Sequence, residues 1–323
     1  MTELETDASG PTLSPRGGPT GDRFFDRLSM GASALVLVLI LAIAAFLIWK
    51  AAPAFRSAGP RFLTEKQWFP DNTPPKFGIA SLAFGTVLSS VLALVMALPV
   101  AIGTALWLVE AAAQSVARPV GYLIELLAAV PSVVYGLWAV FVLVPALVPV
   151  EKWLAGNLAF IPLFDDPQHT FGRNVASASV VLAIMILPIV VSLSREILRQ
   201  VPGAYREAAM ALGATRWEVI RTAVLPSARP GLTGAAMLGL GRALGETIAV
   251  ALVLSSSFDI TWNILSPGGN TIAANIATKF GEAGPAGQAA LVASGLVLFA
   301  ITLAVNMAAR AFVYRGGVAE ARP

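Results

Sequence analysis

Six long apolar windows constrain the fold of this chain more than any other feature of its sequence. A helix needs roughly 20 mostly apolar residues to cross a membrane. The windows are 29–49, 80–107, 121–148, 173–196, 231–256 and 289–312. The composition agrees, since 13% of the residues are charged against about 25% in soluble domains. The sequence therefore predicts an all-α integral membrane protein with about six transmembrane helices.

The windows divide the chain into a transmembrane domain over 29–313 and two polar tails, 1–28 and 314–323. The first tail is rich in Gly, Pro, Ser and Thr, which predicts a disordered segment. Lys and Arg are more numerous in the segments that share a side with the two termini, although the first outer loop, 50–79, is also basic. The excess of positive charge predicts that both termini are cytoplasmic.

Four prolines, Pro99, Pro131, Pro145 and Pro188, lie inside the windows, where neighbouring helices can satisfy the carbonyls that proline frees. The outer loop 50–79 carries several aromatic and proline residues, so we expect it to lie at the membrane interface. The outer segments 149–172 and 257–288 are long enough for short interfacial helices.

The rarity of certain side chains excludes several classes of site. The chain has no cysteine and one histidine, His169, so thiolate metal sites, histidine clusters and histidine-based catalytic triads are not expected. His169 is predicted to be an ordinary residue of an outer loop. The net charge of +3 is too small to suggest nucleic acid. No metal site and no catalytic residue are predicted.

The cytoplasmic loop 199–230 contains a predicted pair of short helices within 204–226. Good helix formers favour a helix over 204–212, and Gly213 is suited to end it in a left-handed conformation. Thr215 followed by Glu218 predicts a capping box, opening a second helix over 215–224 that stops before Pro226. The alternative interpretation is an amphipathic connector lying on the membrane.

The spacing of residues in this loop resembles the EAA loop of ABC-importer permeases. The resemblance is carried by Glu207-Ala208-Ala209, Gly213, Ala223 and Leu225-Pro226, with Ala223 standing where the family usually has a β-branched aliphatic residue. It implies an ABC type I importer permease-like fold in which Glu207, Ala208, Ala209 and Gly213 contact an ATPase. The chain has no G-x-x-x-x-G-K-[ST] phosphate loop, so the resemblance implies that ATP and Mg²⁺ are bound by the partner ATPase and no cofactor by this chain.

Two opposite charges, Arg242 and Glu246, stand near the middle of the fifth window. Charges at this depth are costly and usually functional. Four residues apart on one helix, they would share a face and could form either a structural ion pair or part of a substrate pathway. Arginine suits an oxyanion such as phosphate, sulfate or molybdate. The surrounding glycines predict close helix packing or backbone approach: Gly234, Gly239, Gly241 and Gly245.

Glu125 stands at the start of the third window. Two interpretations are open for its carboxylate. It either snorkels to the membrane surface or caps the first turn of its helix, or it belongs to a pathway.

The sequence around these charges is similar to phosphate-importer permeases. The similar segments are 241–247, which reads GRALGET, and 125–138, while 247–250, which reads TIAV, resembles the PstC-type subunit rather than its PstA-type sister. This implies phosphate transport through a pathway including Arg242 and Glu246, in the bacterial inner (plasma) membrane. The implied partners are a homologous permease (PstA-like), two ATPase subunits (PstB-like) and an external phosphate-binding protein (PstS-like). The alternatives are a permease for another oxyanion, such as sulfate or molybdate, or a secondary transporter or channel.

Overall fold

The computed structural model describes residues 19–165 and 172–318. It divides into two units, one ending at Trp49 and the other beginning at Lys50. Predictions that concern residues 1–18, 166–171 and 319–323, including that for His169, lie outside the described residues.

Residues 19–49 of the helix α1 (Pro19–Ala58) make up the described part of the first unit. The helix begins at Pro19, so the prediction of a disordered tail over 1–28 is wrong from Pro19 onward. Within it, the predicted window 29–49 forms one uninterrupted helix whose large apolar side chains are exposed. An exposed apolar surface of this length matches the hydrocarbon of a bilayer.

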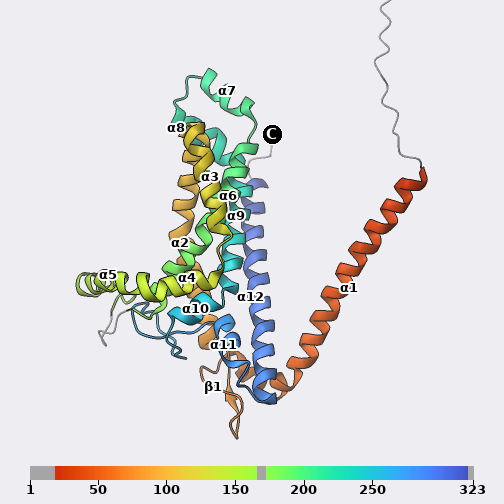
Figure 1. Ribbon diagram of the computed structural model, residues 1–323, viewed down its shortest axis with the longest axis vertical. Coiled ribbons are helices and arrows are strands. Elements are labelled where there is room, and N and C mark those ends of the chain that lie inside the picture. The colour runs from red at the N-terminus through yellow and green to blue at the C-terminus, as the bar shows by residue number, and fades with distance from the viewer. Residues whose placement is uncertain (1–18, 166–171, 319–323) are drawn as a thin grey trace, which may run out of the picture. The chain divides into compact units, whose positions relative to one another are not determined.

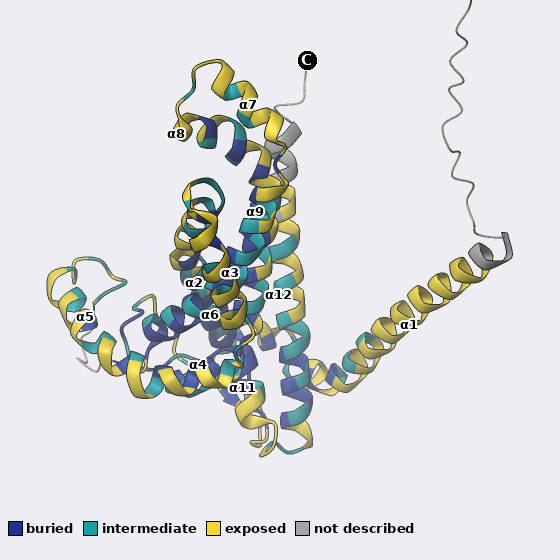
Figure 2. Ribbon diagram, turned by 45° about the horizontal axis from the view of Figure 1, so that its top comes forward, coloured by how far each residue is buried: buried dark blue, intermediate teal, exposed yellow. Residues whose placement is uncertain are grey.

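Long helices in the second unit run side by side around α6 (Val175–Gln200), as Figure 1 shows. In α6, 67% of the most apolar window is buried, and Figure 2 shows the buried residues gathering in this bundle. Asn174 caps its first turn by accepting from the Ser177 N–H at 2.9 Å. The helices that pack against α6 or its neighbours are α2 (Ala80–Leu106), α3 (Gln114–Ala128), α9 (Leu225–Gly245) and α12 (Pro285–Val318).

The third predicted window does not form one helix. It is divided at Ala129–Pro131 into α3 and α4 (Ser132–Trp138). The latter continues through η3 (Ala139–Leu143) and α5 (Val144–Asn157) in a different direction, as Figure 1 shows. Proline lacks an N–H donor and favours an extended residue before it. The expectation that Pro131 would be accommodated within a helix is therefore wrong, whereas the helices continue through Pro99 and Pro188.

Two π-helical turns end two residues before a proline. The Val144 N–H donates to the Ala139 carbonyl ahead of Pro145, and the Leu225 N–H donates to the Ile220 carbonyl ahead of Pro226. A proline ring clashes with the carbonyl four residues back. Because a π turn widens the backbone by one residue, it lets both helices continue past their prolines.

The two ends of the second unit differ. At one end lie α7 (Gly203–Ala211) and α8 (Arg216–Val219), and at the other lie the short elements of the outer loops (Figure 1). These are η1 (Gly59–Leu63), the antiparallel pair β1 (Trp68–Phe69) and β2 (Lys76–Phe77), and α11 (Ile272–Lys279). Phe62 and Trp68 are buried in a cluster with α2 and α12. The first loop therefore packs into the protein, and only part of it, such as Phe69, remains exposed for an interface.

Five of the described helical runs are long and apolar enough to cross a membrane: Phe24–Leu63, Ala80–Ala111, Ser132–Asn157, Val175–Gln200 and Pro285–Ala308. The fifth predicted window is not among them, because α9 ends at Gly245 and a separate helix, α10 (Ile248–Val253), follows. The predicted tail 314–323 is helical as far as Val318.

Candidate functional site

The predicted turn of the cytoplasmic loop is present. Helix α7 ends at Ala211, and Gly213 adopts the left-handed conformation with φ of +84°. Its N–H donates to the Met210 carbonyl at 2.9 Å, and the Ala214 N–H donates to the Ala209 carbonyl at 3.2 Å. A residue with a Cβ pays a conformational penalty of about 1–2 kcal/mol there, so glycine suits this turn.

The predicted capping box is also present. Thr215 Oγ1 accepts from the Glu218 N–H at 3.4 Å, and Glu218 Oε2 accepts from the Thr215 N–H at 2.7 Å. The prediction that this helix stops before Pro226 is wrong. Through η4 (Ile220–Val224), α8 continues without a break into α9. The loop is thus joined to Gly245 by one helical run.

The predicted ATPase contacts lie at the surface of this end. Glu207 and Ala208 are exposed and Ala209 is half-buried. Beside them the loop exposes large apolar side chains, with Leu212 at 90% exposure and Tyr205, Met210 and Trp217 above half. Apolar side chains on a polar loop are characteristic of a surface that another protein covers. We call this surface, Tyr205 to Trp217, the docking surface.

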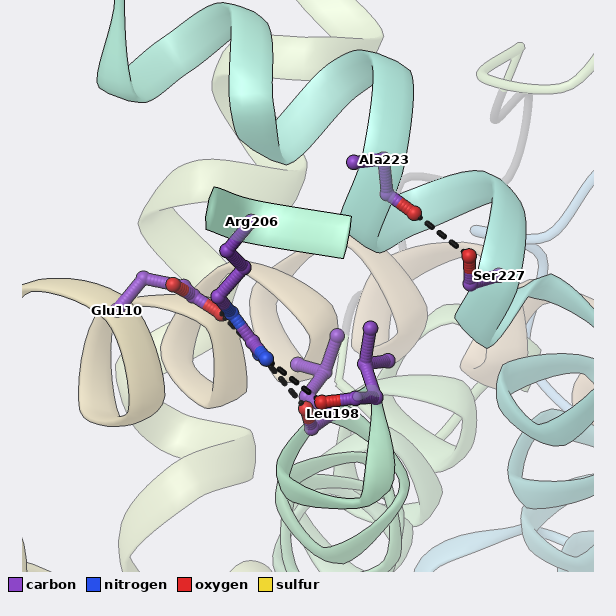
Figure 3. A network of polar contacts seen from close by, with 6 residues as sticks. Glu110, Leu198, Arg206, Ala223 and Ser227 are labelled. Carbon is purple, nitrogen blue, oxygen red and sulfur yellow. Dashed lines mark hydrogen bonds and ion pairs between the residues drawn. The ribbon is translucent and has the colours of Figure 1, made fainter. Parts of the chain in front are cut away.

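Arg206 connects the docking surface to the helices beneath it, as Figure 3 shows. Its guanidinium donates to Glu110 of η2 (Trp107–Ala111) at 2.8 Å and to the carbonyls of Leu198 and Val201 at 3.1 and 2.7 Å. The sequence analysis missed this cluster, since nothing in the spacing of Glu110 and Arg206 predicts that they meet.

Arg242 and Glu246 do not share a helix face. The last residues of α9 carry Arg242, whereas Glu246 follows the helix in an extended conformation with ψ of 132°. Among the described residues, the side-chain ion pairs are Arg195–Glu125 and Arg206–Glu110, so the alternative of a structural Arg242–Glu246 ion pair is wrong. Glu246 instead accepts from the Ala249 N–H at 3.3 Å in the first turn of α10. Glycine favours helix formation poorly, and Gly241 and Gly245 precede the break.

Arg242 lines a cavity of about 840 Å³ between α6, α9 and α12. The α9 residues of its wall recur at helical spacing, which makes one continuous face. The two charged residues of the wall are Arg242 and Arg310, and no carboxylate is among the lining residues, which are Ile189, Pro230, Thr233, Gly234, Met237, Leu238, Gly241, Arg242, Asn306 and Arg310. The arrangement is suited to an anion, because two cations, the Asn306 amide and the Thr233 hydroxyl line one open space.

The glycines of this region divide into two groups. A Cβ on Gly239 would lie 2.6 Å from Val190 Cγ2, so Gly239 allows α9 to approach α6 closely. A Cβ on Gly234, Gly241 or Gly245 would meet nothing within 4 Å. Close packing is therefore confirmed for Gly239, while Gly234 and Gly241 widen the cavity.

Glu125 pairs with Arg195 of α6 at 2.8 Å. It lies in the last turn of α3 rather than in a first turn, so the expectation of helix capping there is wrong. Gly121 provides the space, since a Cβ at that position would overlap the Arg195 guanidinium. Within 19–165 and 172–318, no group of three or more metal-ligating side chains forms a candidate metal site.

Comparison with known proteins places this arrangement in a family. Residues 111–315 match the model of the family described as "Binding-protein-dependent transport system inner membrane component". The chain is 43% identical over 318 residues to the "Phosphate transport system permease protein PstC 2" of Mycobacterium bovis, covering 96% of this chain and 97% of that one. It is 40% identical over 299 residues to "Phosphate transport system permease protein PstC" of Xylella fastidiosa, covering 91% of each.

Among solved structures, the inward-facing MetNI methionine ABC transporter matches with 20% identity and a TM-score of 0.46, over 70% of this chain and 90% of that one. The family assignment depends on the sequence matches, which span the docking surface, the cavity and the helices between them. The chain therefore belongs to the binding-protein-dependent transport system inner membrane components, and it is a multi-pass protein of the bacterial inner membrane.

Proposed function

We propose that this chain is the permease subunit of an ATP-driven importer of inorganic phosphate, and that the cavity on α9 is part of the phosphate pathway. The structural observation that carries the proposal is the cavity wall, which holds Arg242 and Arg310 without a carboxylate. The choice of phosphate among oxyanions is supported by the names of the relatives, each called a phosphate transport permease.

Arg242 is the proposed transient ligand of phosphate. Its planar guanidinium stays protonated at any relevant pH and offers paired donors that match two oxygens of a phosphate.

Glu246 is also proposed to belong to the pathway, in a role other than pairing with Arg242. It is buried, at 9% exposure, and it holds the first turn of α10 where α9 ends. We infer that it maintains the break after Gly245 and thereby the position of Arg242 at the end of α9.

The docking surface is proposed to receive an ATPase subunit through Glu207, Ala208, Ala209 and Gly213. The chain has no phosphate loop of its own, so ATP and Mg²⁺ would be bound and used by that partner. The proposed complete transporter contains this chain, a homologous PstA-like permease and two PstB-like ATPases, with a PstS-like protein delivering phosphate from outside. In this assembly the docking surface and both termini face the cytoplasm.

Uptake of labelled phosphate by proteoliposomes containing the complete transporter tests the pathway. Loss of a charged hydrogen-bond donor removes about 1.5–3 kcal/mol, so we expect Arg242→Ala to lower uptake by roughly 10- to 100-fold. Glu246→Gln should also lower uptake. Lys279→Ala removes a cation from α11 at the other end of the unit, and it should leave uptake unchanged.

Normal uptake by assembled Arg242→Ala and Glu246→Gln variants would overturn the proposed pathway. Competition by sulfate or molybdate at the same concentrations as phosphate would assign the chain to another oxyanion. Uptake that continues without ATP would assign it to the secondary transporters or channels.

A further inference from the structure

Helix α7 is held to the rest of the protein mainly by one polar side chain. It has no fully buried residue, and its one half-buried apolar contact is Ala209, at the edge of a cluster formed by α2, α6 and α9. Arg206 is the exception to this exposed character. Its side chain is 21% exposed and its partner Glu110 is 16% exposed. The ion pair and the charged hydrogen bonds of α7 with the rest of the described chain therefore all pass through the guanidinium of Arg206.

This guanidinium contacts two different helices at once. Its Nε and Nη2 atoms donate to Glu110 Oε1 at 3.2 and 2.8 Å, and Glu110 lies in η2, which continues α2. Its Nη1 donates to the Val201 carbonyl at 2.7 Å, and its Nη2 donates to the Leu198 carbonyl at 3.1 Å, where α6 ends. The last carbonyls of a helix have no partner within the helix and carry its partial negative charge. Arg206 satisfies two acceptors at the end of α6 while it pairs with α2.

The neighbouring residue in sequence is Glu207, which is exposed in the docking surface. A force applied by an ATPase to the exposed side of α7 would thus meet Arg206 on its inner side. By this route the force reaches α2 and α6, the two helices in closest contact in the bundle. A separate, covalent route runs from α8 through η4 into α9 and reaches Arg242.

We propose that Arg206, with Glu110, is a positioning pair that transmits movement of the docking surface to α2 and α6, so that ATP hydrolysis is coupled to phosphate movement. This inference rests on the proposed function. In this role Arg206 contacts the helices of the membrane domain, and it does not contact the ATPase. It also implies that two routes must move together, one to α9 through the backbone and one to α2 and α6 through Arg206.

The chemistry of the junction requires arginine. The three acceptor groups lie around one planar guanidinium, whose five N–H donors point in fixed directions. A lysine ammonium keeps the charge, but it is a compact point charge that cannot reproduce this planar arrangement. Arg206→Lys should therefore resemble Arg206→Ala in coupling, whereas a role limited to positive charge would be rescued by lysine.

The test is the ratio of phosphate taken up to ATP hydrolysed, measured on the complete transporter in proteoliposomes. Arg206→Ala, Arg206→Lys and Glu110→Gln should each lower this ratio several-fold while the ATPase subunits still co-purify and hydrolyse ATP. Because the pair acts as one unit, the double variant R206A/E110Q should be no worse than R206A alone. Arg118→Ala, which removes an exposed arginine of α3 outside the docking surface, is the matched control and should leave the ratio unchanged.

An unchanged ratio in assembled Arg206→Ala and Glu110→Gln transporters would overturn the inference. Loss of the ATPase from Arg206→Ala, with Glu110→Gln normal, would also overturn it, because Arg206 would then belong to the ATPase contact itself. If Arg206→Ala does not assemble, Glu110→Gln decides, since Glu110 lies on the bundle side of the pair. Failure of the wild-type transporter to import phosphate with ATP would instead reject the proposed function.

Discussion

Two neighbouring glycines on α9 face opposite surroundings. Positions two residues apart on a helix point about 200° from each other. Accordingly, Gly239 packs against Val190 while Gly241 opens into the cavity. The same residue type thus serves helix packing at one position and an open pathway at the other.

Gly241→Leu should block transport without weakening the fold. The new side chain meets no atom at its Cβ within 4 Å and would occupy the cavity beside Arg242. We expect phosphate uptake to fall by at least tenfold while the thermal stability of the purified transporter is retained.

Gly103→Leu is the control for this change, because Gly103 on α2 also has open space around a new Cβ but does not line the cavity. Equal loss of uptake in both variants would show that added bulk, rather than obstruction of the cavity, is responsible.

The capping carboxylate of Glu218 predicts a pH dependence of the docking surface. Hydrogen bonds from the N–H and the hydroxyl of Thr215 lower the pKa of Glu218 below its ordinary value. A carboxylate whose pKa is lower in the folded state than in the unfolded state stabilises the folded form. This stabilisation is complete above the unfolded-state pKa and is lost as the pH falls through the folded-state pKa. Between pH 6 and 8 the cap should therefore be constant.

Hydrogen exchange of the Thr215 amide measures this cap. After correction for the intrinsic exchange rate, protection of the amide should be constant from pH 8 to pH 6 and should decline as the pH drops below about 4.3. In Glu218→Gln, which cannot ionise, the decline should disappear. A decline of the same size in that variant would show that another group titrates.

At the scale of helices and loops, local sequence signals predicted some features well. Gly213, Thr215 and Glu218 specified the turn and the cap, because these depend on residues within a few positions of each other. The breaks after Gly245 and at Pro131 combine local glycine and proline chemistry with packing between segments that are distant in the sequence. For example, a Cβ on Gly136 of α4 would lie 2.9 Å from the Ala249 Cα of α10. Windows of hydropathy cannot detect that two short helices pack closely.

Within the candidate site, Glu246 is another residue whose contacts could not be predicted from the sequence. Its type and depth predicted a functional charge, but its partner was assigned from helical spacing that the break at Gly245 removes. The Arg206–Glu110 pair was missed for the converse reason, because its two residues are distant in the sequence. Contacts between residues that are far apart in the sequence depend on the three-dimensional fold.

Deletion of Thr222 should disturb coupling by removing the π turn. A π turn holds one residue more than the α-helical turn that would replace it, so deletion of Thr222 converts η4 into regular helix while the flanking segments keep their rotational register. The Pro226 ring would then clash with the carbonyl four residues back and bend the helical run between the docking surface and α9. We expect membrane insertion to persist and phosphate transported per ATP to fall several-fold.

Thr222→Ala keeps the residue count of η4 and serves as the comparison. It removes the γ-methyl and the hydroxyl, which donates to the Glu218 carbonyl at 2.6 Å. A normal transport ratio in the deletion variant would show that the π turn is not needed for coupling.

At the scale of the whole molecule, the docking surface and the outer elements lie at opposite ends of the second unit (Figure 1). The proposed orientation places the docking surface in the cytoplasm, and the absence of cysteine from the sequence makes it testable. Leu212→Cys should react with a membrane-impermeant maleimide in inside-out vesicles only, and Phe160→Cys in right-side-out vesicles only. Both side chains are exposed, at 90% and 78%.

Both variants, expressed without the ATPase so that Leu212 is uncovered, should reach the membrane in wild-type amounts, which controls for insertion. Labelling of Leu212→Cys from the outside would invert the topology and remove the ATPase from the docking surface. The charge distribution predicts the proposed orientation, but the basic residues of the first outer loop weaken that signal, and the fold alone has no direction in the membrane.

The unbroken helical run from Arg216 to Gly245 has a mechanical consequence. A flexible linker would absorb part of any displacement at the docking surface, whereas a helix resists stretching because each added length would break backbone hydrogen bonds. Its compliant points are η4 and the prolines at positions 226 and 230. A push on the loop should therefore reach Arg242 as a change in the tilt of α9, with its length conserved, so that the arginine swings across the cavity instead of sliding along it.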